Sequence, residues 1–94
     1  MATLLEKIKN GALIVDVRTD YEFEDEHFPG AINIPVNDLL SRMSEFGEDK
    51  ERPIILYCAS GARSAYAAMI LKSHGYKDVT NAGGLDDLLE LAGE

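Results

Sequence analysis

Residues 53–64 read Pro-Ile-Ile-Leu-Tyr-Cys-Ala-Ser-Gly-Ala-Arg-Ser, the segment of the chain with the strongest structural signal. Its apolar run 54–57 has the β-branched and aromatic composition of a buried strand. Small residues follow at once, and residues 64–74 then form a largely apolar helical segment that stops at Gly75. The stretch therefore predicts a strand, a short loop and a helix, with Cys58 at the carboxyl end of the strand.

Strand-like and helix-like segments alternate along the rest of the chain. We expect further short strands at residues 12–17, 31–34 and 79–81. We expect a helix at residues 3–9 and a second that starts at Thr19, which has capping-box spacing to Glu22. A third is expected over residues 38–46, between an Asn37 cap and Gly47. The last should follow a tight Gly83-Gly84 turn that needs positive φ. The acidic run 22–26 reads as a solvated helix face.

This alternation predicts an α/β fold with a central, mostly parallel sheet of four or five short strands and helices on both faces. Functional sites in such sheets lie beyond the carboxyl ends of the strands, where Cys58 falls. The 94 residues, with no internal repeat, fit one domain over residues 1–94.

Bulk charge restricts the partners. Nine basic against 17 acidic residues give a net charge of −8, which disfavours nucleic acid and an anionic membrane surface. The longest apolar run is too short to cross a bilayer. A small anionic substrate remains compatible, because charges beyond about 8 Å are screened at physiological salt.

The single cysteine excludes an internal disulfide. A lone cysteine without a signal peptide predicts a reducing, cytoplasmic compartment, although a removed presequence would change that interpretation. One cysteine and two distant histidines do not form a metal ligand set, so we expect neither a metal nor another cofactor.

Residues 58–64 form a candidate anion cradle. Small residues and a glycine let the backbone curl so that several N–H groups point inward, and the following helix start adds a positive dipole. Arg63 supplies a permanent cation, which we expect to face an anion. A free thiol is about 3% thiolate at pH 7. Such surroundings raise the fraction to about 25–75%, so we expect a charged, exposed sulfur on Cys58.

The segment Cys-Ala-Ser-Gly-Ala-Arg-Ser resembles the active-site loop of the rhodanese family, in which Cys, four residues and Arg precede Thr or Ser. Residues 13–18 (LIVDVR) and 27–35 (HFPGAINIP) resemble the family's N-terminal signatures. Gly75-Tyr76, Val79 and Gly83-Gly84 resemble its C-terminal one. The motifs span nearly the whole chain in the family's order, which implies a rhodanese-like three-layer sandwich.

The resemblance implies a sulfurtransferase. Cys58 would take sulfane sulfur from thiosulfate, a polysulfide or a protein persulfide, and a thiophilic acceptor such as cyanide, a thiol or a partner protein's cysteine would remove it. Two-step covalent catalysis predicts ping-pong kinetics. The residues that would hold the persulfide are Ala59, Ser60, Gly61, Ala62, Arg63 and Ser64.

The chain departs from the family pattern at three positions. Many thiosulfate-using members carry Arg or Lys directly after the cysteine, where this chain has Ala59. The loss of one cation argues against a preference for the thiosulfate dianion. Glu26, where Gly is common, and Leu85, where an aromatic is common, affect packing more than chemistry.

Two other functions remain open from the sequence. Cysteine-dependent phosphatases and arsenate reductases share the loop-before-helix arrangement but place five residues between Cys and Arg, whereas four separate Cys58 from Arg63. A binding or regulatory module, or a sulfur carrier without independent turnover, is the second alternative.

Asp16 and Arg18 end the first strand and are possible supporting residues of the site. A structural ion pair is the favoured interpretation, ahead of direct substrate contact. His27 and His74 read as a turn residue and a helix-end residue, and neither is assigned a catalytic role.

Overall fold

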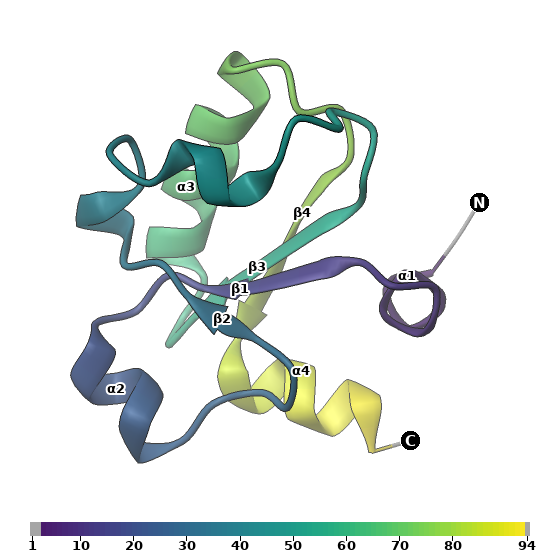
Figure 1. Cartoon of the computed structure of the whole chain (residues 1–94). Helices are drawn as coiled ribbons and strands as arrows, with labels where there is room; N and C mark the ends of the chain where they lie inside the picture. Colours follow the sequence, from purple (N-terminus) through teal and green to yellow (C-terminus); the bar gives the residue numbers. More distant parts are fainter. Residues whose placement is uncertain (1–2, 94) are drawn as a thin grey trace.

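The computed structural model describes residues 3–93, which form a four-stranded sheet whose paired strands are all parallel. The strands lie in the order β2-β1-β3-β4. Their bounds are Leu13–Asp16 (β1), Ile32–Asn33 (β2), Ile54–Cys58 (β3) and Val79–Gly84 (β4). The predicted α/β class and parallel sheet are confirmed (Figure 1).

Strand β3 is buried along its full length. Because successive side chains of a strand point to opposite faces, Ile54, Leu56 and Cys58 face one layer. Ile55 and Tyr57 face the other layer. The cysteine therefore shares its face of the sheet with an apolar core.

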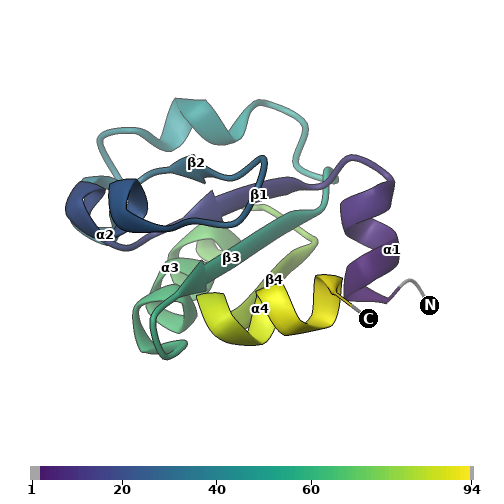
Figure 2. The same ribbon diagram turned by 90° about the horizontal axis from the view of Figure 1, so that it is seen from below.

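Helices cover both faces, as Figures 1 and 2 show. Within residues 3–93, the α-helices are α1 (Leu4–Lys9), α2 (Asp20–Asp25), α3 (Ala62–Ser73) and α4 (Leu85–Ala92). Helix α3 packs on the Cys58 face through Ala67, Ala68 and Leu71. Helices α1 and α4 cover the opposite face, and α2 lies beyond the carboxyl ends of β1 and β3 (Figure 2).

Short helices begin where the sequence indicates. Thr19 caps α2 and Glu22 closes the capping box, so this prediction is confirmed. Thr3 and Glu6 form the same box at α1. Helix α3 starts at Ala62, two residues before the predicted start, and Gly75 follows its C-cap with φ +94°.

The predicted helix over residues 38–46 is wrong. Two 3₁₀ turns occupy this region, η1 (Val36–Asp38) and η2 (Met43–Phe46), and Asn37 makes no N-cap. Arg42, with φ −115° and ψ 21°, leaves the helical region and interrupts the i→i−4 hydrogen bonds. Leu39 and Phe46 are still buried. The apolar spacing thus predicts the buried residues but not the hydrogen-bond pattern.

None of the helices within residues 3–93 combines the length and the apolar character needed to cross a membrane.

Tyr57 carries the one polar group of β3 that points into the α1–α4 layer. Its buried hydroxyl accepts a hydrogen bond from the Phe28 N–H at 2.9 Å. Burial raises the pKa of Tyr57, so this hydroxyl stays neutral.

We predict that Tyr57→Phe lowers the free energy of unfolding by about 1–3 kcal/mol, because the Phe28 N–H loses its acceptor inside the fold. Urea denaturation measures the change. Tyr66→Phe is the matched control, since Tyr66 is 57% exposed. A Tyr57→Phe protein as stable as the control would show that the Phe28 N–H finds another partner.

Candidate active site

Cys58 is the last residue of β3, and its side chain has no accessible surface (0%). The expectation of an exposed sulfur is therefore wrong. The sulfur faces the apolar layer under α3, and the loop that follows it bends back so that Gly61 and Ser64 contact it. A charge on this atom depends on protein donors rather than on water.

Hydrogen-bond donors of the loop surround the sulfur. The Gly61 N–H donates to Sγ at 2.9 Å, and the Ser64 hydroxyl lies 3.5 Å from it. Burial raises the pKa of Cys58, but the Ser64 hydroxyl and the N–H groups of Ser64, Gly61 and Ser60 outweigh burial and lower it to about 7. About half of the thiol is then ionised at pH 7.

Asn81 connects this loop to β4, and the sequence analysis missed it. Its Oδ1 lies 2.6 Å from the Ser64 hydroxyl and accepts the Gly83 N–H, while its Nδ2 donates to the Gly61 carbonyl. The Ser64 hydroxyl has one proton, so Asn81 Oδ1, the Gly61 carbonyl at 3.2 Å and the Cys58 sulfur compete for it. Asparagine is unfavourable in strands, and its presence in β4 was the only feature of the sequence that could have indicated a role for this residue.

A bulge in β4 brings two glycines against the loop. Leu56 pairs with Asn81 and Cys58 with Gly84, so β4 carries one extra residue between them. A Cβ on Gly84 would collide with the Ala59 carbonyl oxygen. The expected turn is only half correct, since Gly83 has φ +89° but Gly84 is extended. The loop therefore packs backbone to backbone on β4.

Arg63 faces a carboxylate of α2 and also interacts with Cys58. Its Nη1 and Nη2 donate to Glu22 Oε1 and Oε2 at 2.7 and 3.0 Å. Hydrogen bonding to Arg63 lowers the pKa of Glu22 to about 2, and the pKa of Arg63 is raised in turn. The prediction that the acidic run 22–26 is exposed to solvent holds for Glu24, Asp25 and Glu26. It does not hold for Glu22, which is half-buried and paired.

Asp16 and Arg18 form the buried ion pair that the sequence favoured. Arg18 Nη2 donates to Asp16 Oδ2 at 2.7 Å and to the Glu26 carbonyl at 2.6 Å. The Arg18 guanidinium also lies 5.7 Å from the centre of the Tyr57 ring. Both charged side chains are buried, and they lie on the opposite face of the sheet from Cys58. This position fits a structural ion pair and not a contact with the substrate.

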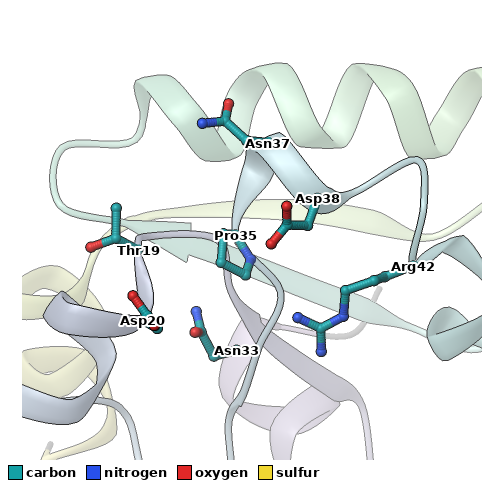
Figure 3. Close-up of a pocket in the computed structure, with 7 residues that line it drawn as sticks. All are labelled: Thr19, Asp20, Asn33, Pro35, Asn37, Asp38 and Arg42. Atoms are coloured by element: carbon teal, nitrogen blue, oxygen red, sulfur yellow. The ribbon is translucent and has the colours of Figure 1, made fainter.

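An open cavity of about 350 Å³ lies beside η1, between α2 and β2 (Figure 3). Its lining residues are Thr19, Asp20, Asn33, Pro35, Asn37, Asp38 and Arg42. None belongs to the cysteine loop, by which we mean residues 58–64, and Arg42 is paired with Glu45. The candidate chemistry therefore lies outside this cavity.

Fold and site together define a class: a parallel α/β protein with a low-pKa cysteine in an N–H-lined loop between its central strand and a helix. A family model of the Rhodanese-like domain matches residues 1–90. The chain belongs to the rhodanese-like family.

Three relatives illustrate the membership. The chain is 40% identical over 74 residues to the thiosulfate sulfurtransferase PspE of Escherichia coli, covering 79% of this chain and 71% of that protein. It is 38% identical over 84 residues to a tRNA uridine(34) hydroxylase of Hamiltonella defensa, covering 84% of this chain but only 24% of that protein. A solved structure described as a rhodanese with anions from E. coli superposes with a TM-score of 0.77 at 39% identity, covering 82% of this chain and 91% of that chain.

We predict that Ser64→Ala raises the pKa of Cys58 by about one unit or less, because the thiolate loses its hydroxyl donor. The rate of alkylation by iodoacetamide, followed against pH, reports this value since the thiolate is the reactive form. The native midpoint should lie near 7, and Ser60→Ala should leave it there because the Ser60 N–H remains. An unshifted midpoint in Ser64→Ala would mean that the native hydroxyl donates to Asn81 Oδ1 or the Gly61 carbonyl and not to the sulfur.

Proposed function

We propose that this protein is a sulfurtransferase that carries sulfane sulfur as a persulfide on Cys58. Its family membership supports the class of activity. The observation that carries the residue assignment is the loop around the sulfur: the Gly61 N–H at 2.9 Å and the neighbouring donors hold the pKa of Cys58 near 7. A thiolate in a water-free cradle is a pre-formed nucleophile that needs no separate base.

The first half-reaction forms one S–S bond and breaks another. The Cys58 thiolate attacks the outer sulfur of thiosulfate, and sulfite leaves with the electron pair of the broken bond. The product is an anionic persulfide, and the loop donors that stabilised the thiolate stabilise it as well. No proton moves in this step, so the loop has only to hold charge.

The second half-reaction returns the enzyme to its starting state. A thiophilic acceptor, such as cyanide or a thiolate, attacks the terminal sulfur of the persulfide. Cys58 leaves as a thiolate, and its lowered pKa makes it a good leaving group. Since donor and acceptor use the same sulfur in turn, the kinetics are ping-pong.

Access to Cys58 requires movement, because its side chain has 0% exposure. The exposed residues Ala59, Ser60 and Ala62 form the outer side of the loop and are the part that a donor meets first. The donor class that we propose is a small sulfur-containing anion, a polysulfide or a persulfide, and the acceptor a small thiophile or a protein thiol. The net charge of −8 supports neither a nucleic acid nor an anionic membrane as partner.

We predict that Cys58→Ser abolishes sulfur transfer while the protein stays folded, because Cys58 is the only cysteine in the chain. Intact-mass analysis after incubation with thiosulfate or a polysulfide should show one added sulfur atom on the native protein and none on the variant. Cyanide or a reducing thiol should remove it.

Either of two results would overturn the proposal: sulfur turnover by Cys58→Ser, or hydrolysis of an aryl phosphate by the native protein with no sulfur uptake. The second result would favour phosphatase chemistry. Sulfur uptake without turnover on small acceptors would instead identify a carrier that delivers to a protein thiol.

We predict that Ala59→Arg raises kcat/KM for thiosulfate by roughly threefold to tenfold, because the exposed position gains a cation beside a dianionic donor. The gain should shrink as salt is added. Ala65→Arg on the exposed side of α3 is the matched control for net charge. An unchanged or salt-independent kcat/KM would argue against a local charge effect.

A further inference from the structure

The cysteine loop has one cationic side chain, Arg63, and that cation is already paired. Its partner Glu22 comes from α2, which follows β1, whereas the loop follows β3. Strands β1 and β3 are neighbours. The chain continues from β1 to β2 on one side of this pair and from β3 to β4 on the other side. The ion pair thus lies where a parallel sheet ordinarily receives its ligand.

The Glu22 carboxylate is held in place independently of Arg63. Its Oε1 accepts hydrogen bonds from the Thr19 N–H and the Thr19 hydroxyl, both at 3.1 Å. Both oxygens then receive the two arms of the guanidinium. A carboxylate fixed by its own helix cap loses little additional freedom on pairing, which favours a persistent pair over an occasional one.

Arg63 also lies close enough to the sulfur to interact with it. The Cys58 sulfur is among the groups that raise the pKa of Arg63, after Glu22. The guanidinium therefore interacts with both a carboxylate and the reactive atom. With Glu22 ionised above a pKa of about 2, the two side chains together present no net charge to an incoming donor.

We propose that Glu22 sets the charge class of the sulfur donor. By neutralising Arg63, it removes the attraction that would concentrate a dianion such as thiosulfate at the loop, and it affects donors of lower charge, such as hydropersulfides, less strongly. The proposal rests on the sulfur-transfer function inferred above and adds a specificity residue to it. Glu22 acts through Arg63 and touches no reacting atom.

Glu22→Gln is the decisive variant, because glutamine preserves the capping box and removes only the charge. We expect kcat/KM for thiosulfate to rise about threefold to tenfold and that for cysteine hydropersulfide, whose sulfur carries at most one negative charge, to rise by a smaller factor of about threefold or less. Glu24→Gln is the control, since Glu24 lies on the same helix, is exposed and carries the same charge. Equal changes for the two donors, or a fall for thiosulfate, would overturn the proposal.

A second measurement separates this inference from the proposed function. Iodoacetate and iodoacetamide are similar in size and alkylate the same thiolate, but only iodoacetate is charged. The rate of Cys58 alkylation by iodoacetate, divided by the rate with iodoacetamide, should rise about twofold to fivefold in Glu22→Gln and stay constant in Glu24→Gln. An unchanged ratio would overturn the charge effect. A raised ratio in a protein that transfers no sulfur would support the charge effect and overturn the sulfurtransferase assignment.

Discussion

A charged sulfur kept away from water is the constraint around which this molecule is built. An anion without solvent is strongly disfavoured unless hydrogen-bond donors replace the lost water. Here the replacement begins with the Gly61 N–H, 2.9 Å from the Cys58 sulfur. The donor is in place only because the loop turns sharply after β3, and the turn is possible only because Gly84 lets the Ala59 carbonyl approach. Asn81 then fastens the loop to β4.

Two arginine–carboxylate pairs near this edge of the sheet differ in their surroundings. Asp16 and Arg18 are buried, and breaking such a pair leaves an isolated charge inside the protein. Glu22 and Arg63 keep 34% and 37% of their side chains exposed, so water can solvate either charge if its partner is replaced, and the fold loses little stability. The first pair is a part of the architecture. The second is accessible to solvent and contributes less to the stability of the fold.

Most local parts of this structure, though not the helix expected over residues 38–46, could be predicted from the sequence, and the contacts between distant segments could not. The apolar run 54–57 and the capping box at Thr19 are encoded within a few residues, so periodicity and spacing were sufficient. The pairing of Glu22 with Arg63 joins residues 41 positions apart, and no local pattern encodes it. The burial of Cys58 and the role of Asn81 likewise depend on how the loop and β4 meet.

The side of the cysteine loop that packs on β4 tolerates fewer substitutions than the side that faces solvent. Gly84 faces the loop backbone and has no room for a side chain, so drift at this position would damage the cradle itself. Ala59 and Ala62 lie on the outer side, open to solvent. A substitution on the outer side can therefore change what meets the loop from solvent, whereas a side chain at Gly84 would displace the loop backbone.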